Sequence, residues 1–381
     1  MINQERLKQH LLEIVQIDSV SGREGRLAQR LKAELEALGA SVEIDAAGEQ
    51  IGGDTGNVIA RLPGTLTAAP PLFLCAHMDT VVPGEGVRPI VEGDIIRTDG
   101  TTVLGGDDKS GISVILEVVR TLQERNIPYS PLEIVFTICE EVGLLGAKHL
   151  DVSRLRSTYG LVLDSDDVGY LFTKAPATNR MEFRVYGLEA HAGVCPERGI
   201  SAIQIVADAI STMRLGRIDY ETTANIGLIE GGMAINIIPN LVRLKAEARS
   251  HSEEKLQAQT QHMINCLEAA ATRHRADLEG VSYIGRVEAD VHRDYDRMDV
   301  PDDARIVQLV KQAARNLGQQ VQTLATGGGC DANVLNKKGL TVANLGTGMQ
   351  QIHTVNEWLD VKEMYKSAAI VLEIVRLNSS S

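Results

Sequence analysis

The stretch LFLCAHMDT, residues 72–80, decides the fold of this chain. The apolar run 72–76 leads directly into His77, which is the pattern of a buried β-strand that ends in a polar side chain. His77 and Asp79 are two positions apart, so an extended backbone places both side chains on one face. A carboxylate beside an imidazole can fix its tautomer and raise its basicity. We therefore regard the end of this strand as the first candidate site.

The same pattern recurs along the chain. The remaining candidates are Asp107 in LGGDDKSG, Glu140 and Glu141 in VFTICEEVG, Asp164 in LVLDSDD and His353 in QQIHTVNE. Carboxylates and imidazoles are common ligands of divalent metals. One acidic residue more than coordination requires can act as a base toward water. Together these positions predict a hydrolase with two metal ions.

Composition excludes several other classes of function. The chain has 381 residues, 44% of them hydrophobic and 23% charged, as expected of a globular protein with about two domains. A formal net charge of −13 argues against nucleic acid as a partner. The longest apolar runs have the length of strands, so we expect no membrane association. The N-terminal residues form an amphipathic helix pattern and not a signal peptide.

The cysteines indicate a reducing compartment. Their number, five, is odd, and no CxxC pair occurs. A disulfide framework is therefore not expected, and we predict a cytoplasmic protein. Cys75 and Cys139 lie close to site residues, but small buried apolar side chains are the favoured interpretation for both.

The first part of the chain alternates helix and strand patterns. We predict a strand at 58–62, 72–76, 133–138 and 160–163, and a helix at 3–16, 24–38, 110–124, 302–317 and 361–377. Nearly continuous apolar strands separated by helices predict an α/β fold, a mixed sheet with helices on both faces. Ligands of such sheets bind beyond the carboxyl ends of the strands, where His77, Glu140 and Asp164 stand.

The rhythm of the pattern changes near residue 179. From there we predict, in order, a strand at 181–186, a helix at 200–214, strands at 222–229 and 241–248, a helix at 253–274 and a strand at 281–290. This β-α-β-β-α-β order is that of an α+β ferredoxin-like unit. The sequence thus predicts a lid or dimerisation domain at 179–291, inserted into a discontinuous catalytic, metal-binding domain at 1–178 and 292–381.

Each candidate position also has a plainer interpretation. The segment Gly105–Gly111 could be a phosphate loop, although its glycine spacing does not fit, or a helix N-cap. Glu140 and Glu141 could lie in a solvated turn, and a lone loop histidine such as His353 is more often structural. The metal hypothesis is favoured because several separate strand ends carry ligand-type side chains in an apolar context.

These residues resemble the dinuclear zinc hydrolases that include peptidase T, acetylornithine deacetylase, succinyl-diaminopimelate desuccinylase and carboxypeptidase G. The resemblance covers essentially the whole chain and is closest to the peptidase T-like branch. Its motifs in this sequence are HMDTVVPG, DGTTVLGGDDKSG, the pair Glu140-Glu141, AHAGVCPERGISAI, GGMAINIIPN, EARS, TGGGCDAN and the histidine His353. One departure is Ala325-Thr326, where peptidase T has an arginine before its paired glycines, so the resemblance does not extend to strict tripeptide specificity.

The resemblance implies a zinc-exopeptidase-like fold and a set of metal ligands. His77 and Asp164 would bind one metal ion, Glu141 and His353 the other, and Asp107 would bridge both. The ions implied are zinc, with cobalt or manganese as alternatives.

The resemblance also implies catalytic roles. Glu140 would be the general base, and Asp79 would orient His77. His191, in the inserted domain, would stabilise the tetrahedral intermediate across a homodimer interface formed by that domain. The positions implied to contact the substrate are Asn236, Arg249 and Gly328.

We therefore expect a metallopeptidase that hydrolyses the amide bond of a short peptide, of the aminopeptidase or tripeptidase type. A metal-activated water would attack the bond, with Glu140 as the base. The first alternative is an N-acyl amino acid deacylase of the same superfamily. The second is an inactive homologue that only binds or acts as a scaffold.

Overall fold

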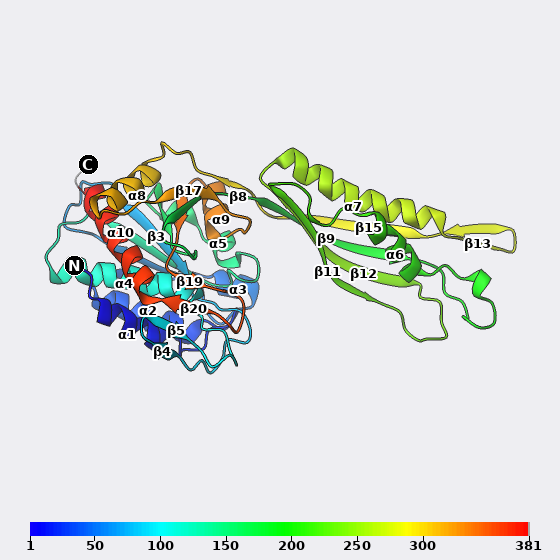
Figure 1. Cartoon of the computed structure of the whole chain (residues 1–381), viewed down its shortest axis with the longest axis horizontal. Helices are drawn as coiled ribbons and strands as arrows, with labels where there is room; N and C mark the ends of the chain where they lie inside the picture. The colour runs from blue at the N-terminus through cyan, green and yellow to red at the C-terminus, as the bar shows by residue number, and fades with distance from the viewer. Residues whose placement is uncertain (380–381) are drawn as a thin grey trace. The chain divides into compact units, whose positions relative to one another are not determined.

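The computed structural model describes residues 1–379, which form two compact units (Figure 1). The second unit is Ala175–Arg297 with Gly327–Gly329, and the first unit comprises the chain before it, Met298–Thr326 and the chain from Cys330. The domain predicted at 179–291 falls within the limits of the second unit.

The first unit is built on a nine-stranded sheet in which β17 pairs with β8 and the other strands follow the order β1-β2-β6-β3-β7-β18-β8-β16. The pairs β6–β3, β3–β7 and β7–β18 are parallel, whereas β1–β2, β2–β6 and β18–β8 are antiparallel, so the sheet is mixed as predicted. Its strands are β1 (Ser41–Ile44), β2 (Val58–Leu62), β3 (Leu72–His77), β6 (Leu132–Thr137), β7 (Tyr159–Val162), β8 (Tyr170–Ala175), β16 (Met298–Asp299), β17 (Gln322–Ala325) and β18 (Thr341–Leu345).

The centre of this sheet is buried on both faces. Every residue of β3, β6 and β7 is buried, which explains why their sequences are apolar without alternation. Gly160 lets β7 approach β3, because a Cβ there would lie 2.0 Å from the carbonyl oxygen of Phe73. The register pairs His77 with Thr137 and Cys75 with Val162, so these three strands end at the same edge of the sheet.

Helices cover the sheet and pack on one another. Helix α4 contacts β3, α1 and α10 contact α4, and α8 contacts α10. No helix within residues 1–379 is both long and apolar enough to cross a membrane. The helices of this unit are α1 (Gln4–Ile14), α2 (Gly25–Ala37), α3 (Ala47–Ile51), α4 (Gly106–Glu124), α5 (Leu145–His149), the 3₁₀ helix Val152–Arg154, α8 (Arg305–Asn316), α9 (Asp331–Lys337) and α10 (Val361–Ser379).

A small antiparallel sheet links two distant segments of the first unit. Its order is β19-β20-β5-β4, and β20 pairs directly with β5. The sheet therefore connects the segment after β18 to the segment before α4. Its strands are β4 (Ile90–Glu92), β5 (Ile95–Arg97), β19 (Met349–Gln350) and β20 (Trp358–Asp360).

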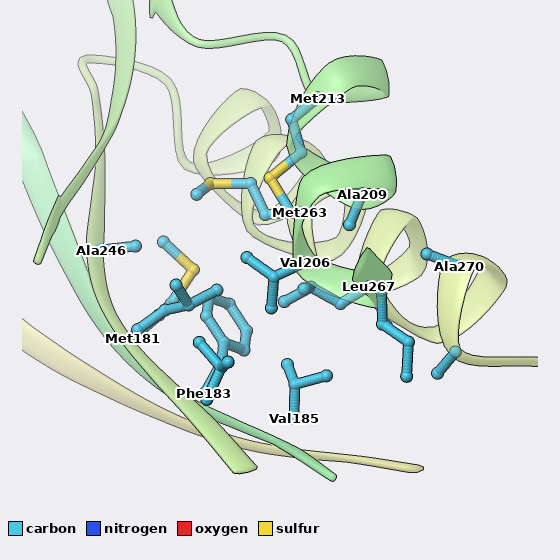
Figure 2. Packing of buried hydrophobic residues seen from close by; sticks show 14 of the residues in the cluster. Met181, Phe183, Val185, Val206, Ala209, Met213, Ala246, Met263, Leu267 and Ala270 are labelled. Carbon is cyan, nitrogen blue, oxygen red and sulfur yellow. The ribbon is translucent and has the colours of Figure 1, made fainter. Parts of the chain in front are cut away.

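The second unit is an antiparallel sheet with the order β10-β11-β12-β9-β15, covered on one face by α6 and α7. Figure 2 shows Met181, Phe183 and Val185 of β9 pointing toward Val206 and Leu267 of the two helices. From Asn179 onward, alternate residues of β9 are buried, as the period of a one-sided sheet requires. The elements are β9 (Ala177–Tyr186), the 3₁₀ helix Pro196–Arg198, α6 (Ala202–Thr212), β10 (Gly216–Arg217), β11 (Thr222–Gly231), β12 (Leu241–Ser250), α7 (Glu253–Arg273), β13 (Arg275–Leu278), β14 (Val281–Ile284) and β15 (Arg286–Tyr295).

The single strand predicted at 281–290 is wrong. Residues of β14 pair with β13 in a separate hairpin, and β15 joins the main sheet beside β9. The break falls at Gly285, whose amide donates to the carbonyl oxygen of His274 at 3.1 Å. A Cβ at Gly285 would lie 2.5 Å from Cδ1 of Ile205, so the chain changes direction where no side chain fits.

Candidate metal centre

Side chains from several strand ends meet at the carboxyl edge of the large sheet. His77 is the last residue of β3, Glu140 and Glu141 follow β6, and Asp164 follows β7. Because β3 lies between β6 and β7 and runs parallel to both, the three ends are neighbours. Asp107 comes from the start of α4, where its backbone is not helical, and points to the same place. The structure thus brings together residues that are as far apart as 77 and 164.

The carboxylate of Asp107 lies between two imidazoles. Its Oδ1 is 3.0 Å from Nε2 of His77, and its Oδ2 is 3.1 Å from Nε2 of His353. The same nitrogen of His353 is 2.9 Å from Oε2 of Glu141. On the other side, Nε2 of His77 is 3.9 Å from Oδ1 of Asp164. One aspartate therefore faces two histidines, and each histidine has a second carboxylate of its own.

Two overlapping groups of side chains could each hold a metal ion. One group is His77, Asp107 and Glu141, and the other is His77, Asp108 and Asp164, with all ligand atoms of a group within 4.8 Å of one another. Asp108 was not among the predicted ligands. Its Oδ2 accepts from the amide of His77 at 3.2 Å and its Oδ1 from that of Gly111 at 3.1 Å. The contact with Gly111, three residues further on, is that of a helix N-cap.

Asp79 holds the residues on either side of it. The Nδ1–H of His77 donates to the backbone oxygen of Asp79 at 2.9 Å, which leaves Nε2 facing the carboxylates of Asp107 and Asp164. The Asp79 carboxylate accepts from the amides of Glu140 at 2.9 Å and Glu141 at 3.2 Å, and from the Ser21 hydroxyl at 2.6 Å. Asp79 thus fixes the paired glutamates as well as the histidine.

Sequence reasoning missed a second carboxylate that holds the same turn. Glu24 is fully buried, and its Oε1 accepts from the amides of Gly22 and Cys139, both at 3.0 Å. Cys139 has a φ of +50°, which a non-glycine residue rarely adopts, directly before Glu140. Nothing in the sequence marks Glu24, because an acidic residue at the start of a helix is ordinary.

Burial and neighbouring charges shift the pKa values of the side chains in this cluster. Burial, together with nearby carboxylates, raises the pKa of Glu140 and of Asp164 well above their usual values. Burial opposes the charge of Asp107 as well, but hydrogen bonds from His353 and His77 outweigh it and lower the pKa of that carboxyl. Hydrogen bonds to Asp107 and Glu141 raise the pKa of His353 to about 10. In the metal-free protein, protons on the imidazoles therefore offset the negative charge of these carboxylates.

This donor set fits divalent cations. Within residues 1–379, the ion pairs of Asp107, Glu141 and Asp164 are with imidazoles and not with lysine or arginine. Oε1 of Glu141 is buried without a hydrogen-bond partner in the described chain. Burying an unpaired carboxylate oxygen costs free energy unless a cation binds it. Nitrogen and oxygen donors with excess negative charge suit zinc and similar ions.

The phosphate-loop alternative at Gly105–Gly111 is wrong. Its lysine, Lys109, is buried, and its Nζ donates to the backbone oxygen of Ile17 at 2.8 Å. A lysine held in this way cannot reach a nucleotide phosphate.

All five cysteines are free, and Cys75 and Cys139 are buried as expected.

The remaining predicted residues lie in the second unit. His191 is exposed, and its backbone forms an antiparallel bridge with Ile237. Next to it, the amide of Ala192 donates to the Asn236 carbonyl oxygen at 2.9 Å. The Arg249 guanidinium donates two hydrogen bonds to Glu247 of its own strand, at 2.9 and 3.1 Å. Gly328 belongs to the short segment Gly327–Gly329 of this unit. Their roles toward a substrate stay predictions.

Comparisons with known proteins identify the family of the chain. Residues 73–377 match the family described as peptidase family M20/M25/M40. The uncharacterized protein YqjE of Bacillus subtilis (strain 168) is 43% identical over 376 residues, which cover 98% of this chain and 99% of that protein.

Two solved structures are similar along the full length of both chains. The aminopeptidase PepT from Bacillus cereus ATCC 10987 has 40% sequence identity and a TM-score of 0.88, with complete coverage of both chains (100% each). A tripeptidase from Staphylococcus aureus subsp. aureus Mu50 has 39% identity and a TM-score of 0.93, again with 100% coverage of each. The chain therefore belongs to peptidase family M20/M25/M40, as a peptidase T-like metallopeptidase that hydrolyses peptide bonds.

Proposed function

We propose that this metallopeptidase cleaves short peptides at a centre of two divalent cations shared through Asp107. The observation that carries the proposal is the position of the Asp107 carboxylate, 3.0 Å from Nε2 of His77 and 3.1 Å from Nε2 of His353. One cation would be held by His77 and Asp164, and the other by Glu141 and His353. Two histidines and three carboxylates favour zinc, with cobalt or manganese as substitutes.

Glu140 is the proposed general base. Its backbone is fixed by Asp79, its side chain is buried, and it forms no ion pair with either imidazole in the described chain. Bound divalent cations supply a water of lowered pKa and polarise the scissile carbonyl. In this proposal the carboxylate of Glu140 would take a proton from the attacking water and later give it to the leaving amine.

The second unit is proposed to act as a lid and a dimerisation module. His191 would stabilise the developing oxyanion, and Asn236, Arg249 and Gly328 would contact the peptide. Strand β10 pairs with β11 only at Thr223 and Ala224, so within the described chain the outer edge of β11 beyond them is open to another copy. We propose a homodimer through this unit, which a monomeric mass by light scattering would contradict.

Short peptides are also the proposed partner class, in preference to N-acyl amino acids, because the two similar solved structures are an aminopeptidase and a tripeptidase. We propose a cytoplasmic location on the basis of the five free cysteines, which suit a reducing compartment.

A substrate panel separates peptidase from deacylase. Zinc- or cobalt-loaded protein, offered di- and tripeptides with a free amino terminus and the matching N-acetyl amino acids, should release amino acids from the peptides. The measurement is amine release by ninhydrin assay and mass spectrometry. Faster turnover of the N-acetyl amino acids would assign the chain to the deacylase branch.

Replacing the proposed base should separate catalysis from cation binding. Glu140→Ala should lower kcat by roughly 10²- to 10⁴-fold, because the general base is lost while the ligands stay. Cation content, measured by elemental analysis, should match that of the parent. Near-parental kcat on a peptide that the parent cleaves would show that another group is the base.

Binding of the cations should release protons. Since His353 has a pKa raised to about 10, it is protonated at pH 7.5 in the metal-free protein and must lose that proton to coordinate. Calorimetry of Zn²⁺ binding in buffers of different ionisation enthalpy should show net proton release, and the affinity should rise with pH. His353→Gln should release fewer protons. The control His274→Gln, at an imidazole paired with Asp208, should release as many as the parent. Heats independent of the buffer would contradict the proposed ligation.

A further inference from the structure

A buried glutamate from the end of the chain binds the backbone that carries Asp107. The side chain of Glu357 is almost fully buried. Its Oε2 accepts from the amides of Leu104 at 2.7 Å and Gly105 at 2.8 Å, and its Oε1 accepts from the amide of Asp107 at 3.0 Å. One carboxylate thus satisfies three donors about 250 positions away in sequence, including the amide of Asp107 itself.

The paired glycines of the motif make room for this carboxylate. Gly105 has a φ of +71°, a left-handed conformation that glycine adopts readily. A Cβ on Gly106 would lie 3.0 Å from Oε1 of Glu357, which is too close for a relaxed contact. Gly105 and Gly106 therefore allow a protein carboxylate, and not a phosphate, to approach this turn.

Glu357 also belongs to the segment that carries His353. The amide of Glu357 donates to the carbonyl oxygen of Thr354 at 3.1 Å, which closes a tight turn after His353. The segment then enters β20, which pairs with β5. Glu357 therefore joins the backbone of Asp107 to the loop of His353. The side chains of Asp107 and His353 are themselves in contact, with Oδ2 of Asp107 3.1 Å from Nε2 of His353.

We propose that Glu357 is a positioning residue for the metal centre: its carboxylate fixes the Asp107 backbone against the His353 loop, so that the Asp107 carboxylate faces both imidazoles. The inference rests on the proposed function, in which Asp107 is shared by two cations. Hydrogen bonds behind the ligands orient them and change metal affinity by roughly 10- to 100-fold.

Glu133 provides a matched control. It is also a buried glutamate whose carboxylate accepts backbone amides, from Arg156 at 2.9 and 3.0 Å and from Ser157 at 2.7 Å. It lies near the start of β6, at the opposite end of the strand from Glu140 and Glu141. Replacing either glutamate is expected to lower the stability of the protein. Only the replacement of Glu357 is expected to weaken the binding of cations.

The experiment titrates Co²⁺ into the metal-free, full-length protein and its variants, and follows the visible absorption of the bound cobalt. Glu357→Gln replaces one acceptor oxygen with an NH₂ group that faces amide donors. It should weaken binding of at least one Co²⁺ roughly 10- to 100-fold and change the absorption bands. Glu133→Gln, measured at a temperature where both variants are folded by circular dichroism, should bind as the parent does.

Parental affinity and spectrum in Glu357→Gln would overturn the proposal, as would an equal loss in Glu133→Gln. Should Glu357→Gln fail to fold, Gly106→Ala displaces the same carboxylate without removing it. That variant should weaken Co²⁺ binding, with Gly53→Ala, where a Cβ meets nothing closer than 3.7 Å, as its control. Parental binding by Gly106→Ala would then overturn the proposal. A parent protein that binds no Co²⁺ would instead contradict the proposed function.

Discussion

The structure depends on one carboxylate placed between two imidazoles. Asp107 reaches His77 with one oxygen and His353 with the other, and the neighbouring side chains of Glu140, Glu141 and Asp164 are all acidic. Such a concentration of carboxylates is unfavourable unless cations compensate it. Protons on the imidazoles supply that compensation in the protein alone, and divalent cations would replace them. Asp107 is thus both the proposed shared ligand of the cations and the centre of the charged cluster.

Backbone amides hold this arrangement, and buried carboxylates accept from them. Asp79 and Glu24 bind the amides of the turn that presents Glu140, while Glu357 binds the amide of Asp107. Each carboxylate comes from a different part of the chain, so each hydrogen bond fixes one segment of the site against another. In the proposed centre, groups held in this way would need little reorganisation during the reaction.

Much of this site could be predicted from the sequence, because the candidate residues follow apolar runs that form buried strands. Apolar runs that fill a parallel sheet end at one edge, so the sequence pattern alone groups His77, Glu140 and Asp164. Glu357 could not be found in this way, because a side chain that binds a distant amide leaves no pattern in the sequence. The break at Gly285 was missed for a similar reason, since the strand-like pattern continues across it.

Anomalous diffraction from crystals of the protein incubated with Zn²⁺, collected at the zinc absorption edge, tests the central claim most directly. The account predicts two peaks in each chain, on either side of the Asp107 carboxylate, one beside Nε2 of His77 and the other beside Nε2 of His353. A single peak, or peaks that Asp107 does not touch, would contradict it.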